Sequence, residues 1–256
     1  MTINPPDLCR RRGDYGIDGD FRVIPARWQA MIAAAIVAAL IALTVRNIAA
    51  GAVVGAVVTG SLTLGLVLFQ GSYLYTTRVG KFEVWSRLLT DLRLRGDEQV
   101  LDLGCGRGAL LLMAAELLPR GRAVGIDLWL ADQTGNSPEA ARRNAEREGV
   151  AERVELETGD ITQLPFADNT FDLIVSNLVL HNIPSPADRR AAIDEAVRVL
   201  RPGGRLAIAD LMATNGYRAR LHELGLTDVR RRNLGWRMWW GCPLFPTRLV
   251  TATKKI

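Results

Sequence analysis

Residues 28–69 constrain the fold of this chain more than any other segment, because they form two apolar runs that are almost free of charge. The first run covers residues 28–45 and the second covers residues 48–69. Arg46, which lies between them, is the only charged side chain of the whole segment. Each run approaches the roughly 20 residues that an α-helix needs to cross a bilayer. One helix over both runs would be about 60 Å long, roughly twice the hydrocarbon thickness. The sequence therefore predicts a two-helix transmembrane hairpin that turns at Arg46-Asn47.

Basic residues on both sides of the hairpin predict its orientation. Five Arg residues precede the first run. The second run is followed by Arg78, Lys81, Arg87, Arg93 and Arg95. Because cytoplasmic flanks of membrane helices are rich in Lys and Arg, we expect an integral membrane protein with both termini in the cytoplasm. A late start and an immediate second run argue against a cleavable signal peptide. A buried hairpin in a globular protein is the alternative.

Small residues at helical spacing, Gly51-xxx-Gly55 and Ser61-xxx-Gly65, indicate a homodimer that forms through the hairpin. The simpler interpretation is that Gly and Ala are common in membrane helices.

Charge and cysteine content exclude several classes of protein. The net charge of +5 comes from 32 basic and 27 acidic side chains, without a dense basic stripe. We therefore do not expect a nucleic-acid partner. Cys9, Cys105 and Cys242 are scattered, so neither a disulfide framework nor a structural zinc site is predicted, and nothing in the sequence requires a metal.

The chain divides into four parts. We expect a flexible cytoplasmic tail over residues 1–27, the hairpin over 28–69, a linker with an amphipathic helix over 70–97, and a catalytic domain over 98–256. Strands are predicted at 99–103, 123–127, 154–158, 171–177, 205–210, 228–233 and 248–253, and helices at 108–118, 138–148, 186–200 and 216–224. This alternation predicts an α/β fold with a doubly wound, mostly parallel sheet of seven strands. The last two strands, which lack a long helix between them, are expected to pair antiparallel at one edge.

A glycine-rich turn follows the first predicted strand. The segment VLDLGCGRG ends a buried strand with Gly104, Gly106 and Gly108, and a helix follows. Glycines allow a backbone to approach a ligand closely, and a helix N-terminus offers amide donors. Asp127 lies nineteen residues after Gly108, at the end of the next strand, where an acid suits ribose hydroxyls. Because NAD-binding proteins use a related turn, the motif alone does not identify the cofactor.

The motifs taken together resemble the class I S-adenosylmethionine-dependent methyltransferases, especially the ubiquinone/menaquinone type. The matching segments are DLGCGRG (102–108), the acid Asp127, GDITQLPF (159–166), FDLIVSN (171–177) and LRPGGRLAIAD (200–210). The resemblance covers residues 99–210 and implies a Rossmann-like fold with S-adenosyl-L-methionine as cofactor. It does not extend to the hairpin.

The resemblance also implies roles for individual positions. Gly104, Gly106 and Gly108 would shape the loop under the cofactor, and Asp102 would hold its methionine end. Asp127 would bind the ribose hydroxyls, and Leu128 would lie against the adenine. Asp160 would accept the adenine amino group, with the Ile161 amide near a ring nitrogen, and Asn177 would line the methyl-transfer site.

His181 is the candidate general base, because it follows the fourth strand closely and imidazole suits proton transfer. A histidine that only packs in the loop is the alternative. Trp129, Trp236, Trp239 and Trp240 are expected either to line an acceptor pocket or to contact the membrane.

We therefore predict a membrane-anchored methyltransferase that acts on a small hydrophobic or amphiphilic acceptor. The segment 177–180 lacks the Asn-Pro-Pro-aromatic signature of enzymes that methylate nucleobase amines, which argues against DNA or RNA as acceptor. The three thiols lie far apart in the sequence, so we also expect a poor resemblance to arsenic methyltransferases. A phospholipid N-methyltransferase and a non-catalytic, cofactor-binding membrane protein are the alternatives.

Overall fold

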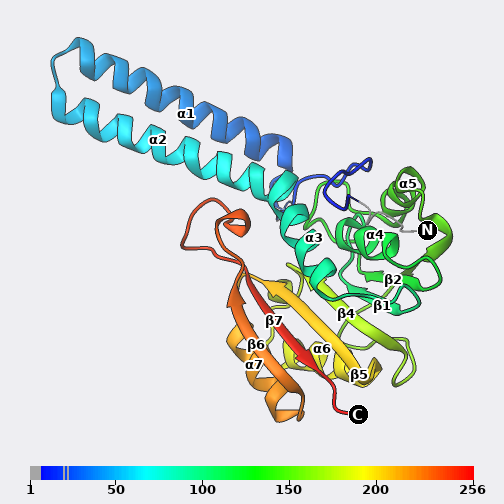
Figure 1. Ribbon diagram of the computed structural model, residues 1–256. Coiled ribbons are helices and arrows are strands. Elements are labelled where there is room, and N and C mark those ends of the chain that lie inside the picture. The colour runs from blue at the N-terminus through cyan, green and yellow to red at the C-terminus, as the bar shows by residue number, and fades with distance from the viewer. Residues whose placement is uncertain (1–6, 20, 22) are drawn as a thin grey trace.

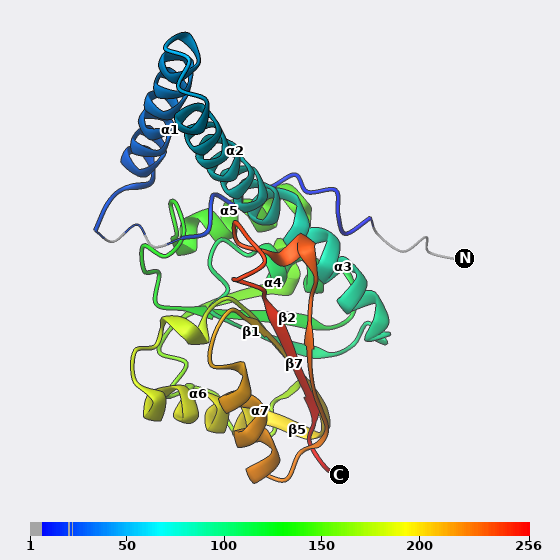
Figure 2. The ribbon, with the colours of Figure 1, turned by 90° about the vertical axis from the view of Figure 1, so that its left-hand side faces the viewer.

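The computed structural model describes residues 7–19, 21 and 23–256 (Figure 1). Helices α1 (Ala26–Ala49) and α2 (Val53–Tyr75) run antiparallel and project from the rest of the molecule (Figures 1 and 2). A hydrogen bond of 2.9 Å joins the hydroxyls of Thr44 and Thr59 between the two helices. Both helices are long and apolar enough to cross a membrane.

The turn of the hairpin lies later than we predicted. Arg46 and Asn47 are still helical, and the chain reverses over residues 50–52. Gly51 has a φ of +70°, a left-handed conformation that glycine adopts without strain. Arg46 in the last turn of α1 is favourable because a helix C-terminus carries partial negative charge. The prediction of a turn at Arg46-Asn47 is therefore wrong by several residues.

The glycine spacing predicted for a dimer is also partly wrong. Gly51 lies in the turn, so Gly51 and Gly55 do not share a helix face. A Cβ on Gly55 would lie 3.0 Å from the Asn47 amide, which places this position against α1 of the same chain. Ser61 and Gly65 both lie on α2, and nothing lies within 4 Å of a Cβ built on Gly65.

Helix α2 continues into the soluble part of the molecule. A π-helical turn, η1 (Thr76–Gly80), connects it directly to α3 (Lys81–Asp91). The apolar face of α3 packs into the domain, with Trp85 only 2% exposed and Leu89 fully buried. The predicted amphipathic helix thus belongs to the domain core and joins the hairpin rigidly to it.

The domain is a seven-stranded sheet with helices on both faces (Figures 1 and 2). Its strands are β1 (Gln99–Leu103), β2 (Arg122–Asp127), β3 (Val154–Thr158), β4 (Phe171–Asn177), β5 (Leu200–Asp210), β6 (Thr227–Asn233) and β7 (Arg248–Thr253). Their order is β3-β2-β1-β4-β5-β7-β6, and β7 pairs antiparallel with both of its neighbours. The predicted fold class and the antiparallel edge are confirmed.

The helices of the domain divide between two apolar clusters, one on each face. On one face α3 packs with α4 (Ala109–Glu116) and α5 (Pro138–Glu148). On the other lie α6 (Pro186–Val199) and α7 (Thr214–Glu223). Short 3-10 turns occur at η2 (Ala151–Arg153), η3 (Leu180–Asn182) and η4 (Trp236–Met238). Ser137 and Ser185 accept backbone hydrogen bonds at the N-termini of α5 and α6, as capping residues do.

The segment before the hairpin, dark blue in Figure 1, packs on the domain. Leu8 and Tyr15 are buried. Arg11 forms an ion pair of 2.7 Å with Glu116, and the Tyr15 hydroxyl donates to Glu148 over 2.7 Å. The expectation of a flexible tail is therefore wrong for residues 7–19, because their polar groups find partners on α4 and α5. Residues 1–6 of that prediction lie outside the described residues.

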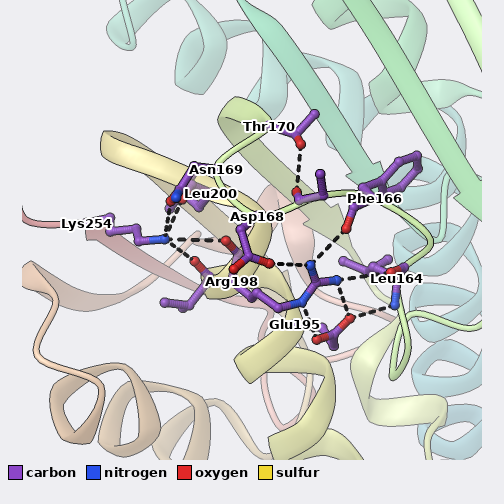
Figure 3. A network of polar contacts seen from close by, with 11 residues as sticks. Leu164, Phe166, Asp168, Asn169, Thr170, Glu195, Arg198, Leu200 and Lys254 are labelled. Carbon is purple, nitrogen blue, oxygen red and sulfur yellow. Dashed lines mark hydrogen bonds and ion pairs between the residues drawn. The ribbon is translucent and has the colours of Figure 1, made fainter.

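A polar network fixes the chain between β3 and β4 (Figure 3). Arg198 at the end of α6 donates to the Phe166 carbonyl and to the Asp168 carboxylate, each over 2.8 Å. It also binds the Leu164 carbonyl and the carboxylate of Glu195. The loop that follows the predicted adenine-binding acid is thus held by one guanidinium.

Candidate active site

A cavity of about 230 Å³ lies where the carboxyl ends of the central strands meet the base of the hairpin. Ligands of open α/β sheets bind at this edge. The predicted residues that line it are Asp102, Gly104, Gly106, Asp127, Asn177 and His181. Other elements also contribute to the lining. The segment of residues 7–19, here called the strap, adds Asp18, and helix α2 adds Tyr73. Helix α3 adds Lys81 and Trp85, and the loop before β7 adds Trp240.

The glycine turn brings backbone against this cavity. Gly104, Gly106 and Gly108 all have positive φ values, +70°, +53° and +86°. A Cβ on Gly104 would lie 2.3 Å from a methyl group of Val179. The loop after β4 can therefore close on the turn only because position 104 has no side chain.

Two carboxyl groups, those of Asp102 and Asp127, lie next to the glycine turn. Asp127 accepts hydrogen bonds from the amides of Gly106 (2.8 Å) and Trp129 (2.6 Å), which fix its orientation at the end of β2. Asp102 is 2% exposed, and its Oδ2 atom has no hydrogen-bond partner. Burial, and then the nearby charge of Asp127, raise the pKa of Asp102 well above its usual range. An unpaired buried oxygen beside a cavity is suited to a ligand that donates a hydrogen bond.

The residues predicted for the adenine lie outside the cavity lining. Leu128 is 50% exposed, Asp160 is exposed and Ile161 is buried. Asp160 Oδ1 accepts from the Thr162 amide over 2.8 Å. Gly108 is the N-cap residue of α4 and is likewise not part of the lining. The structure brings the predicted methionine and ribose residues together and leaves these four positions beyond the cavity.

His181 has a partner that the sequence analysis missed. Its Nδ1 atom lies 2.5 Å from Asp210 Oδ1, and its backbone amide donates to Asp210 Oδ2 over 3.0 Å. Asp210 is fully buried at the end of β5 and also accepts from the Tyr217 hydroxyl over 3.1 Å. A carboxylate on Nδ1 fixes the tautomer and orientation of an imidazole, which leaves Nε2 free to accept a proton.

The tryptophans separate into two groups. Trp240 is buried and lines the cavity, as does Trp85, which sequence analysis did not single out. Trp236 is 52% exposed and stacks on Tyr75 near the end of α2. Trp129 donates to the Thr158 hydroxyl over 2.8 Å and does not line the cavity.

Sequence analysis counted Lys81 only among the basic residues that flank the hairpin, and gave it no role in the site. Asp18 had no signal at all, because its partners lie far along the chain. Sequence spacing does not reveal such contacts.

These observations define a class: an α/β protein with a ligand cavity at a glycine turn, at the carboxyl edge of its sheet. A family model described as a methyltransferase domain matches residues 94–227. The chain belongs to this family of methyltransferases, and its cofactor is S-adenosylmethionine. The glycine turn, the unpaired oxygen of Asp102 and the oriented Asp127 fit that cofactor.

Curated relatives support the assignment. Arsenite methyltransferase from Halobacterium salinarum is 39% identical over 118 residues, which cover 46% of this chain and 28% of that protein. The poor match expected from the scattered thiols is therefore wrong for this part of the chain. Ubiquinone/menaquinone biosynthesis C-methyltransferase from Roseobacter denitrificans is 34% identical over 133 residues, 52% of this chain and 50% of that protein. The chain thus spans about half the length, or less, of these relatives.

A solved structure confirms the fold. The SAM-dependent methyltransferase from Aquifex aeolicus superposes with a TM-score of 0.53 at 20% identity, covering 66% of this chain and 88% of that one.

Proposed function

We propose that this protein is a membrane-anchored methyltransferase whose acceptor is a small hydrophobic or amphiphilic molecule that enters from the bilayer. The observation that carries the proposal is the position of the cavity at the base of the hairpin. Tyr73 in the last turn of α2 packs edge-to-face on Trp240, and both line the cavity. An apolar acceptor leaving a membrane along α2 would meet this aromatic wall first.

The exposed apolar surface supports the membrane anchor. None of the side chains of α1 is buried, and Thr59 is the only buried one of α2. The loop before β7 adds Leu244 (84% exposed) and Phe245 (53% exposed). Its neighbour Gly241 packs on Phe69 of α2, where a Cβ would lie 2.3 Å from the ring. We propose that the hairpin spans the bilayer, that this loop contacts its surface, and that both termini are cytoplasmic.

In methyl transfer, the main task of the protein is to position the acceptor. The bound cofactor supplies a methyl group activated on a sulfonium. Holding the acceptor atom in line with that methyl group gives most of the acceleration. We propose that His181 accepts the proton of a phenol, enol or thiol acceptor, and that Asp210 orients the imidazole. Asn177 and Trp85 would form the wall beside the acceptor.

The acidic lining of the cavity favours an uncharged or cationic acceptor. Asp127 and Asp132 line it in addition to the ion pair of Asp18 and Lys81, and Lys81 is its only Lys or Arg side chain among the described residues. An anionic head group would be repelled there. Quinone precursors and lipophilic phenols are uncharged. The name of the Roseobacter relative places that protein in ubiquinone/menaquinone biosynthesis. A lipid amine, the acceptor of a phospholipid N-methyltransferase, is the second candidate on the same observation.

The test is a labelling experiment with full-length protein in nanodiscs. The protein is incubated with methyl-labelled S-adenosylmethionine and a membrane lipid extract, and organic-phase products are identified by mass spectrometry. Label in one apolar product that Asp127→Ala fails to form would support the proposal and identify the methylated atom. Label confined to water-soluble products would exclude a membrane acceptor. Cofactor binding with no labelled product would favour a non-catalytic binding protein.

A further inference from the structure

Lys81 is a buried cation in the cavity wall. Its side chain is 3% exposed at the first position of α3, and no other Lys or Arg among the described residues lines the cavity. Its Nζ atom donates to Asp18 Oδ2 over 2.7 Å. A lysine ammonium has three donors, so this one contact does not use its full capacity.

Asp18 is held in place by groups other than Lys81. Its Oδ2 atom accepts from the Thr77 hydroxyl over 2.7 Å, and its Oδ1 atom accepts from Gln133 Nε2 over 2.9 Å. Its backbone forms a bridge with Gln133, and the Gly19 amide donates to the Asp132 carbonyl. The carboxylate would therefore stay in the cavity wall if Lys81 turned toward a ligand.

The cofactor requires such a pair of charges. The methionine end of S-adenosylmethionine carries a carboxylate and an ammonium group on one carbon. Asp127 offers no favourable site for that carboxylate, because like charges repel. A buried ammonium donates strong, charge-assisted hydrogen bonds to a carboxylate.

We propose that Lys81 and Asp18 form a clamp for the methionine zwitterion, in which Lys81 binds the carboxylate and Asp18 binds the ammonium. In this arrangement the strap before the hairpin and the first turn of α3 are parts of the cofactor site. The inference rests on the cofactor and is independent of the proposed acceptor.

The test compares two ligands that differ at the methionine end. S-adenosylhomocysteine carries the amino-acid group, whereas 5′-methylthioadenosine lacks it. Dissociation constants are measured by calorimetry with the full-length protein in nanodiscs. Lys81→Met should weaken S-adenosylhomocysteine on the order of 10- to 100-fold and change 5′-methylthioadenosine less than about twofold. Arg78→Met, an exposed position in the adjacent π-helical turn η1, is the matched control and should change neither.

A second variant guards against misfolding, because Lys81→Met leaves Asp18 without its cation. The double variant Lys81→Met, Asp18→Asn removes both charges and should show the same ligand-selective loss. Equal losses for both ligands, or no loss for S-adenosylhomocysteine, would overturn the clamp. These assays contain no acceptor, so a failure to find a methylated product would count against the proposed function and not against the clamp.

Discussion

Trp85 donates its indole Nε1 hydrogen to Asn177 Oδ1 over 2.9 Å, and this bond joins the helix after the hairpin to the carboxyl end of β4. Trp85 is 2% exposed, and both residues line the cavity. Since α3 continues α2 through a π-helical turn, this contact connects the end of the hairpin to the strand edge. The position of the Asn177 amide therefore depends on how α3 is seated.

Trp85→Phe keeps an aromatic ring and removes the donor. We expect a loss of about 1–3 kcal/mol in the free energy of unfolding, from the unpaired Asn177 oxygen and the smaller ring. S-adenosylhomocysteine should also bind several-fold more weakly. Thermal unfolding and calorimetry measure the two effects. Trp236→Phe is the control, because Trp236 is exposed. A variant at position 85 that matches this control would show that the bond has no structural role.

Asp127→Ala should weaken cofactor binding at least 100-fold. The substitution removes the carboxylate proposed for the ribose hydroxyls and leaves the Gly106 and Trp129 amides without their acceptor. Asp127→Asn keeps one carbonyl oxygen, and its affinity for the cofactor should lie between those of the wild type and Asp127→Ala. Equilibrium dialysis with labelled S-adenosylhomocysteine gives the constants. Glu152→Ala, in an exposed 3-10 turn, should bind as the wild type does. Unchanged affinity in Asp127→Ala would refute the ribose assignment.

The sequence predicted one half of this site well and the other half poorly. Asp127 and Asn177 end parallel strands, and Asp102 is the last residue but one of another, so the three lie at one edge of the sheet. Asp18 and Lys81 come into contact because the strap packs against the first turn of α3. The spacing of residues in the sequence does not predict such a tertiary contact. The partnership of His181 with Asp210 depends in the same way on the loop after β4 folding back onto β5. Hairpin length was predictable from hydropathy, whereas its turn depended on one glycine.

Asp102→Asn should stabilise the protein at neutral and alkaline pH while weakening cofactor binding. Burial and the nearby Asp127 raise the pKa of Asp102. The folded state therefore keeps this proton to a higher pH than the unfolded state, whose carboxyl titrates near pH 4 (roughly). The contribution to stability is complete below that pH and is lost as pH rises toward the folded pKa. We expect a gain of about 1–2 kcal/mol at pH 8 and a flatter pH dependence, measured by denaturant unfolding. If the free energy of unfolding of Asp102→Asn changed with pH as steeply as that of the wild type, this prediction would be wrong.

Arg198→Ala should destabilise the domain by about 2–3 kcal/mol, because several charge-assisted hydrogen bonds are lost together (Figure 3). Arg201→Ala is the matched control. Arg201 forms a partly exposed ion pair of 2.8 Å with Asp172, which is worth about 1 kcal/mol or less. Chemical denaturation of both variants measures the difference. Equal losses would show that the loop between β3 and β4 is held by other contacts.

His181→Ala should lower kcat about 100-fold or more for an acceptor that loses a proton, with the affinity for S-adenosylhomocysteine unchanged. Asp210→Asn should lower kcat less, because Asp210 acts only by orienting the imidazole. The measurement is kcat against pH with the acceptor identified by labelling. Added imidazole should restore part of the activity of His181→Ala, a readout that a purely structural role would not give. His222→Ala, on the exposed side of α7, is the control. An unaltered pH profile and no rescue would remove His181 from the mechanism and leave positioning as the whole of the catalysis.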